Sequence, residues 1–337
     1  MASAHWTILT EAVPIGWQNR LRRSARRLLT WRLDGLDLGH PSVTRSLARG
    51  LGKLGVAFTL NPISPRAISG VCMVLSSVAA LRQAIEWKQH GKVRLLLAGP
   101  NLMVRSNEHG GILAAPEIDA CVVPSEWVAA AYLDDLSPLS HRIRVWYAGV
   151  DEFYWAPHRS ATPRTNALIY CKNADAELLR SVKSILEGAG WPTISINYGS
   201  YSRKEYRAAL QKSKFAVFLS ASESQGIALA ESWAMDVPTL VWQPQELVIG
   251  GRRYTRFSSS PYLNEMVGAR WTLREEFEQL VARLPALIST FSPRAWLLSN
   301  MTDVHAARRL TDIVDELLEA QTTSSTLART SAPTPPA

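Results

Sequence analysis

Residues 215–242 contain a strand, a loop, a helix and a second strand in that order, which limits the chain to a parallel α/β fold. "FAVFLS" at 215–220 is a short apolar run with aromatic and β-branched residues, typical of a buried strand. Strong helix formers follow in "IALAESWAM", and "VPTLVW" opens another apolar strand after Asp236. A strand–helix–strand unit of this kind joins parallel neighbours of one sheet.

Two glutamates flank the turn from strand to helix in this unit. Glu223 is in the loop at the carboxyl end of a strand, where open α/β sheets bind their ligands. Gly226 allows the backbone to come close to a bound group. Glu231 lies about two turns into the helix, and its neighbours three and four positions away are all apolar: Ile227, Ala228, Ala234 and Met235. A solvated face is the ordinary reading of a helix glutamate, but a carboxylate on an apolar face needs partners. Hydroxyls of a sugar or ribose would serve.

The same alternation of strand and helix recurs along the chain, with "TWRLDG" at 30–35 as a possible first strand and a long helix expected over 72–91. It restarts after a proline-rich stretch near residue 160, which reads as a linker. The pattern predicts two doubly wound α/β domains with a ligand cleft between them. The expected divisions are a basic amphipathic N-terminal extension (1–29), an N-terminal Rossmann-like acceptor-side domain (30–158), a C-terminal Rossmann-like donor domain (159–290), C-terminal helices (291–320) and a disordered tail (321–337).

The composition fits an ordinary globular protein, with 337 residues, 47% hydrophobic and 20% charged. Cys72, Cys121 and Cys171 are not clustered, so we expect reduced core residues of a cytoplasmic protein. The seven histidines form no ligand pair, and we therefore expect no metal site. No apolar run reaches the ~20 residues needed to span a bilayer.

The net charge of +8 indicates an anionic partner. Much of it lies in a possible amphipathic helix whose basic residues share one side: Arg20, Arg22, Arg23, Arg26 and Arg27. Such a helix predicts contact with an anionic membrane surface, or else packs on the first domain. Nothing resembles a nucleic-acid recognition motif, so we expect no nucleic-acid partner.

Four segments resemble one enzyme group. "SESQGIALAE" resembles the E-x7-E signature of retaining glycosyltransferases of the glycogen-synthase-like group (family 4, group 1), which have the GT-B fold. "VVPSEWV", "RIRVWYAGVDEFYWAP" and "DVPTLVW" resemble further segments of that group, in the same order and at similar spacing. The resemblance implies an α/β fold of two Rossmann-like doubly wound domains facing a cleft, with the C-terminal helices returning to the first domain.

The resemblance also implies roles for single residues. Glu223 would contact hydroxyls of the donor sugar, Glu231 would accept both ribose hydroxyls, and Lys172 would bind the diphosphate. The turn and helix N-terminus would face the donor's sugar and phosphates through Ser224, Gln225, Gly226 and Ile227. A cation on the diphosphate suits a leaving group whose charge grows as the bond breaks. Members of this group need no metal or cofactor.

Some positions depart from the group's pattern. Its second phosphate cation, usually about five residues after the first, is missing here, and would have to come from Arg105 or the Arg252–Arg253 pair. Gln225 replaces a common aromatic residue, and Ala148 replaces an asparagine. These changes affect donor identity and catalytic power and leave the fold untouched.

Three first-domain residues are further candidates. His109, in "NEHGG", would reach the donor sugar or orient an acceptor hydroxyl, unless it is an ordinary loop histidine. Gly35 occupies the place of the group's first-domain glycine loop, and His40 is a weaker candidate nearby.

The sequence thus predicts a metal-independent retaining glycosyltransferase that moves a sugar from a UDP- or GDP-sugar to a glycan or glycoconjugate acceptor in polysaccharide or glycoconjugate biosynthesis. We expect it in the cytoplasm, at the inner face of the membrane if the basic segment binds lipid. Two alternatives stay open. One is a non-catalytic GT-B protein that binds a glycan or partner in a glycosylation complex, and the other is a GT-B sugar-nucleotide epimerase.

Overall fold

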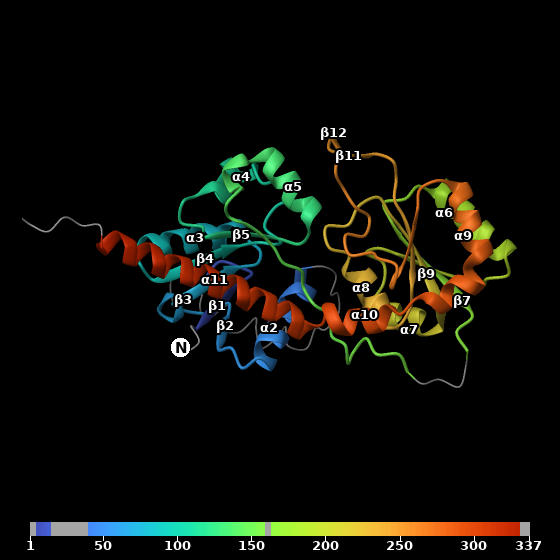
Figure 1. The fold of residues 1–337 in the computed structure, drawn as a ribbon, viewed down its shortest axis with the longest axis horizontal. Coiled ribbons are helices and arrows are strands. Elements are labelled where there is room, and N and C mark those ends of the chain that lie inside the picture. Colours follow the sequence, from blue (N-terminus) through green and yellow to red (C-terminus); the bar gives the residue numbers. More distant parts are fainter. Residues whose placement is uncertain (1–4, 15–39, 159–162, 331–337) are drawn as a thin grey trace, which may run out of the picture.

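The computed structural model describes residues 5–14, 40–158 and 163–330. They form two α/β domains side by side along the long axis of the molecule (Figure 1). The chain runs through the first domain, crosses to the second, and returns to the first in one long C-terminal helix. None of the helices in the described ranges is long and apolar enough to cross a membrane.

The first domain is built on a six-stranded parallel sheet in the order β2-β1-β3-β4-β5-β6. Its strands are β1 (Trp6–Leu9), β2 (Phe58–Leu60), β3 (Gly70–Val74), β4 (Val93–Ala98), β5 (Ala120–Val123) and β6 (Ile143–Val145). Its helices are α2 (His40–Lys53), α3 (Val78–Gln89), the short α4 (Glu108–Gly111) and α5 (Glu126–Asp135). One face of the sheet packs on α3 and α5 and the other on α2 and the C-terminal helix, so both faces are buried.

Two expectations about this domain are wrong. Trp6–Leu9 is a fully buried strand between β2 and β3, so this part of the expected 1–29 extension belongs to the sheet. Residues 72–91 are not one helix: Cys72 lies in β3, and α3 begins only after Ser77. The Ser77 side chain accepts a hydrogen bond from the Ala80 backbone and so caps the new helix. The basic segment, the strand expected at 30–35 and Gly35 lie outside the described residues.

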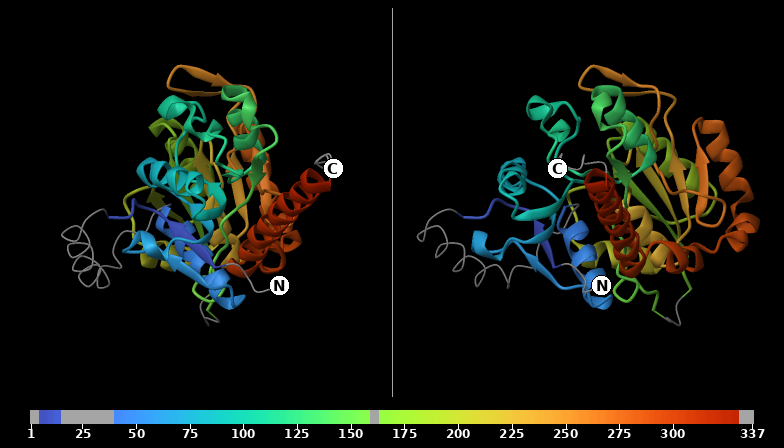
Figure 2. Two further views of the ribbon diagram at one scale, coloured as in Figure 1. Left: turned by 90° about the vertical axis from the view of Figure 1, so that its left-hand side faces the viewer. Right: turned by 60° about the vertical axis from the view of Figure 1, so that its left-hand side comes forward.

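The second domain has a five-stranded parallel sheet in the order β13-β10-β9-β7-β8. Its strands are β7 (Asn166–Lys172), β8 (Thr193–Asn197), β9 (Ser213–Ser220), β10 (Thr239–Trp242) and β13 (Gly268–Trp271). Its helices are α6 (Ala176–Gly188), α7 (Arg203–Lys212), α8 (Ile227–Ala234), α9 (Arg274–Leu287) and α10 (Pro293–Asn300). An antiparallel hairpin, β11 (Leu247–Ile249) and β12 (Arg252–Tyr254), extends away from the sheet at the same end of the molecule as α5 (Figures 1 and 2).

The last helix, α11 (Asp303–Thr330), lies along the first domain and packs on α2, as expected for C-terminal helices that return. It continues ten residues past Ala320, so the expectation of a disordered tail from residue 321 is wrong as far as Thr330. Thr322 and Thr323 donate hydroxyl hydrogen bonds to carbonyls one turn earlier. These bonds satisfy the polar side chains within the helix.

The two passages of the chain between the domains pair with each other. Val150 and Thr302 form a parallel bridge, with the Val150 N–H donating to Met301 O at 3.0 Å and the Asp303 N–H donating to Val150 O at 3.3 Å. Gly149 lies against this crossing, where an added Cβ would come within 2.3 Å of Thr302 O. Only glycine fits there without moving the backbone.

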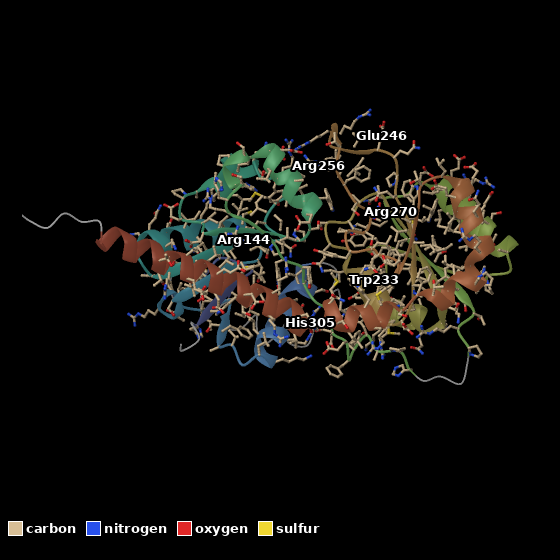
Figure 3. The ribbon with its side chains drawn as sticks, in the orientation of Figure 1. Arg144, Trp233, Glu246, Arg256, Arg270 and His305 are labelled. Atoms are coloured by element: carbon tan, nitrogen blue, oxygen red, sulfur yellow. The ribbon has the colours of Figure 1, made fainter. Side chains whose placement is uncertain are left out.

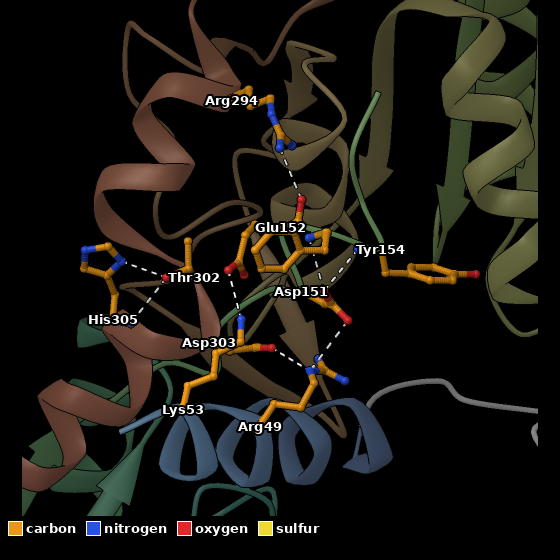
Figure 4. A network of polar contacts seen from close by, with 10 residues as sticks. Arg49, Lys53, Asp151, Glu152, Tyr154, Arg294, Thr302, Asp303 and His305 are labelled. Atoms are coloured by element: carbon orange, nitrogen blue, oxygen red, sulfur yellow. Dashed lines mark hydrogen bonds and ion pairs between the residues drawn. The ribbon is translucent and has the colours of Figure 1, made fainter. Parts of the chain in front are cut away.

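Charged side chains surround this crossing (Figure 4). Arg49 of α2 donates to Asp303 at 2.6 Å and lies 3.6 Å from Asp151 of the linker. Asp303 is fully buried, and its burial raises the pKa of its carboxyl although Arg49 opposes this. Lys53 pairs with Glu152 at 3.0 Å. The first domain, the linker and α11 therefore meet in one ionic network.

We predict that Gly149→Ala lowers the free energy of unfolding by about 2 kcal/mol, because its methyl group would overlap backbone that cannot move alone. Urea unfolding of the full chain measures the change. Gly52→Ala is the matched control. It lies in α2 with no atom near the added Cβ, and should stabilise the protein by about 0.5–1 kcal/mol. Equal stability of Gly149→Ala and wild type would show that the crossing tolerates a side chain.

Candidate functional site

A cleft of about 220 Å³ lies between the two domains, at the carboxyl ends of strands from both sheets. This is where open α/β sheets bind ligands. The first domain contributes residues from the start of α2 and from the loops after β4 and β5. The second contributes residues from the end of β7, from the loops after β8 and β9, and from α8. The lining residues are Ser42, Val43, Asn101, Pro124, Tyr170, Lys172, Tyr198, Tyr201, 223–228 and Glu231.

The turn after β9 is held in place by backbone contacts within the second domain. The Glu223 N–H donates to Ser258 O at 2.9 Å. Gly226, with φ 83°, precedes α8 in the left-handed region, and a Cβ there would also meet Leu229 at 2.7 Å. Because both the angle and the space favour glycine, the turn can begin α8 directly beside the cleft, with its first N–H groups free of intrahelical partners.

Glu223 and Lys172 form an ion pair inside the cleft. The Lys172 Nζ lies 3.1 Å from Glu223 Oε1 and 3.0 Å from Oε2, and Ser220 Oγ donates to Oε1 at 2.9 Å. Lys172 ends β7 and Ser220 ends β9, and the two are paired in register. The Lys172 ammonium also lies 4.7 Å from the centre of the Tyr198 ring. The adjacent parallel strands β7 and β9 thus bring Lys172 and Glu223 together, although they lie 51 positions apart in the sequence.

Glu231 lies on α8 and lines the same cleft as Glu223 and Lys172. It is only 8% exposed. Among the described residues, no N–H or O–H group donates a hydrogen bond to its carboxyl. Burial raises the pKa of Glu231 to about 8, against the opposing effect of Arg203 and Arg45. A second cavity, smaller than the cleft, shares Glu231 with it and is also lined by Arg45, Arg49 and Arg203. The carboxyl is therefore placed to accept hydrogen bonds from a ligand.

Gln225 contributes its backbone to the cleft, since its side chain is used elsewhere. Its amide Nε2 donates to Ala148 O at 2.7 Å, and the Ala148 N–H donates to its Oε1 at 2.9 Å. Gln225 is buried. The two unusual positions noted in the sequence, 148 and 225, thus bind each other across the domains. Ser224 and Ile227 line the cleft on either side of this contact.

His109 does not line the cleft, so the structure does not support its expected role. It lies exposed in α4 with φ 54°, in a turn that continues through two glycines in the left-handed region. The loop after β4 instead places Asn101 in the cleft, and its side-chain Nδ2 is buried without a hydrogen-bond partner among the described residues. Of the other first-domain candidates, Gly35 is outside the described residues, as is the side chain of His40.

The expected substitutes for the second phosphate cation are engaged elsewhere. Arg105 and Arg252 both pair with Asp135 at the end of α5. Although burial opposes its ionisation, these two guanidinium groups hold the pKa of Asp135 below its usual value. Arg253 pairs with Glu246, which lies beside the hairpin (Figure 3). Lys172 is the only cation among the described residues that line the cleft.

Sequence reasoning missed two tyrosines of the cleft and one arginine of the smaller cavity beside it. Tyr198 and Tyr201 follow β8, and the rule that placed Glu223 after β9 could have found them. Arg203 gave no signal, because a basic residue at a helix start is ordinary on a surface. Its guanidinium lies 4.4 Å from the Tyr154 ring centre. Its Nε is buried without a hydrogen-bond partner among the described residues. No group of three or more possible metal ligands occurs in the described part of the chain.

No protein-family model matches the sequence, and no curated protein sequence matches it. Solved structures do. The chain is similar to the apo form of the lipopolysaccharide outer core galactosyltransferase WaaB, with a TM-score of 0.53 and 10% identity over 93% of this chain and 99% of that one. Anabaena Alr3699/HepE, in complex with UDP and glucose, gives 0.53 and 8% over 92% and 99%.

A chain of the GtfA/B complex gives a TM-score of 0.51 and 13% identity over 74% of this chain. Our chain spans only 58% of that chain's length. These structure neighbours are GT-B glycosyltransferases. At such low identity the likeness extends to the fold alone. With its two parallel sheets and the cleft between them, the chain has the GT-B fold of two facing Rossmann-like domains.

Proposed function

We propose that the protein is a retaining glycosyltransferase that takes a sugar from a nucleotide-diphosphate donor to a glycan or glycoconjugate acceptor. The observation that carries this proposal is the joint placement of Lys172, Glu223 and Glu231 along one interdomain cleft. In one nucleotide-sugar, the Lys172 cation would match the phosphates, the Glu223 carboxylate the sugar, and the Glu231 carboxylate the ribose. The GT-B fold adds support, since the structure neighbours are glycosyltransferases.

In this proposal each residue acts at a stated part of the donor. The Lys172 ammonium stabilises the charge that develops on the departing diphosphate. Donor binding draws it from the Glu223 carboxylate, which then accepts hydrogen bonds from the sugar hydroxyls. The free N–H groups at the start of α8 face the phosphates. Glu231 accepts the ribose hydroxyls, and Arg203 and Arg45 beside it add positive charge. No step in this scheme uses a metal.

A non-catalytic GT-B protein that binds a glycan or a partner is the second candidate. One observation favours it: Arg105 and Arg252 are tied to Asp135, which leaves Lys172 as the only cation among the described cleft-lining residues. The placement of the two glutamates favours the enzyme. Location in the cytoplasm, with the basic segment at an anionic membrane, stays part of the proposal.

A nucleotide screen tests the function. We predict that one of UDP, GDP, ADP and TDP raises the melting temperature by several degrees without added metal, and that CMP and chelator have little effect. A ligand at a hundredfold excess over its Kd stabilises the folded state by ~2.7 kcal/mol. The shift should shrink in Lys172→Ala and Glu231→Ala. Lys214→Ala is the control, since Lys214 lies exposed at the opposite end of β9. No shift with any nucleotide at millimolar concentration would favour the non-catalytic candidate.

We predict that Glu223→Gln lowers the rate of sugar transfer about a hundredfold, equivalent to ~3 kcal/mol, while the protein stays folded. Glutamine keeps the size of the side chain and removes the charge that Lys172 faces. The control is Glu246→Gln, which breaks an exposed ion pair outside the cleft. Transfer at the normal rate by Glu223→Gln would remove Glu223 from the mechanism.

We predict that nucleotide affinity rises with pH because of Glu231. Its pKa of about 8 means that the carboxyl is largely protonated at pH 6, and only the ionised form accepts both ribose hydroxyls. Binding then costs a deprotonation, so Kd should fall by up to about tenfold per pH unit between pH 6 and 8 and level off above. In Glu231→Gln, only ionisation of the ligand itself should still change the Kd with pH. Calorimetric titrations that give parallel pH profiles for both proteins would contradict the prediction.

A further inference from the structure

The first domain binds the backbone of the Glu223 loop directly. At the start of α5, Ser125 Oγ donates to Ser224 O at 2.6 Å, and the Trp127 indole Nε1–H donates to Glu223 O at 2.9 Å. Both donors belong to the segment "VVPSEWV", to which the proposed function gives no role. Two consecutive carbonyls of a loop in one domain are thus held by two side chains of the other.

The surroundings of these two donors fix their direction. Ser125 is 1% exposed, and Trp127 is half-buried. The Trp127 ring makes an edge-to-face contact with Tyr254 of β12, with ring centres 6.4 Å apart and planes at 86°. Arg252 lies 4.9 Å from the Tyr254 ring centre and pairs with Asp135 of α5. The hairpin therefore packs against the Trp127 indole, and contacts with the second domain hold both ends of α5.

Apart from the Gln225 side chain, which binds the Ala148 backbone, the loop's other attachments come from its own domain. Ser258 accepts from the Glu223 N–H, and Lys172 with Ser220 holds its carboxylate. Of the polar groups of Glu223 and Ser224, the two carbonyls are the ones that the first domain binds. If the domains move apart, these carbonyls lose their donors, whereas the carboxylate keeps Lys172. Separation of the domains would therefore remove the hydrogen bonds to these two carbonyls and leave the ion pair of the Glu223 carboxylate intact.

We propose that Ser125 and Trp127 are positioning residues that place Glu223 for sugar transfer only when the two domains are closed. This proposal rests on the proposed function, because it assigns Glu223 to the donor sugar. The first domain, which faces the acceptor side of the cleft, thereby controls the second domain's reactive loop. The nucleotide half of the site, Lys172 and Glu231, does not depend on these two hydrogen bonds.

A matched control is available beside them. Tyr262 OH donates to Pro124 O at 2.6 Å, so this bond also crosses between the domains, one residue from Ser125. Its acceptor is a carbonyl of the first domain and not one of the carbonyls of residues 223–224. Tyr262→Phe removes an interdomain hydrogen bond without releasing the loop carbonyls.

The kinetic test compares Trp127→Phe and Ser125→Ala with Tyr262→Phe in the full chain. Phenylalanine keeps an aromatic ring against Tyr254 and loses the N–H. We expect each of the first two variants to lower kcat about three- to tenfold, the usual effect of one lost hydrogen bond. The Kd of the nucleotide diphosphate should stay within about twofold of wild type. Tyr262→Phe should keep kcat within about twofold. An equal loss of kcat in Tyr262→Phe, or a change in Kd that accounts for the whole effect, overturns the proposal.

A second measurement does not require activity. Hydrogen–deuterium exchange of the ligand-free protein, read on the peptide that covers 221–226, should be faster in Trp127→Phe and Ser125→Ala and unchanged in Tyr262→Phe. If wild type transfers no sugar from any donor, the proposed function fails, and this exchange pattern still tests whether the first domain positions the loop. Identical exchange in all four proteins overturns the positioning role.

Discussion

The crossing of the two interdomain passages is the constraint on which the cleft depends. Gly149 leaves no room between the linker and Thr302, and the bridge at Val150 ties both passages together. Arg49 of α2 binds Asp303 at this crossing. Because the first turn of α2 also lines the cleft through Ser42 and Val43, one helix connects the crossing to the ligand site. Any change in the angle between the domains must therefore move part of the cleft wall.

The two glutamates of the cleft have different environments and hence different chemistry. Glu223 has a cation and a hydroxyl on its carboxylate before any ligand arrives. Glu231 lies on a buried helix face, and its raised pKa reflects the free energy of removing a charge from water. A ligand with hydroxyl groups would supply the missing donors at Glu231, and one with an anionic group would take Lys172 from Glu223. A nucleotide-sugar has both.

Much of the site could be predicted from the sequence, and the errors have physical causes. Glu223 was found because a parallel strand ends where ligands bind, and this depends only on local pattern. Lys172 was found through the resemblance to the glycosyltransferase group. Residues 72–91 were misread because one apolar run suits a buried strand as well as a helix. His109 was wrongly placed in the cleft, since the pattern shows that a loop follows β4 but not which of its residues turns inward. Asn101 does so instead.

The sequence by itself determined the parallel α/β architecture, the strand-to-helix turn with its glycine, and the two carboxylates that flank this turn. Periodicity and turn residues act over a few positions, so they need no knowledge of the rest of the chain. Only the tertiary structure decided which groups meet across the domains: Trp127 on the carbonyl of Glu223, Gln225 on Ala148, and Arg45 near Glu231. The first two of these contacts join residues 77 or more positions apart. These contacts exist because the crossing places the two domains face to face, and no local sequence pattern encodes the angle between the domains.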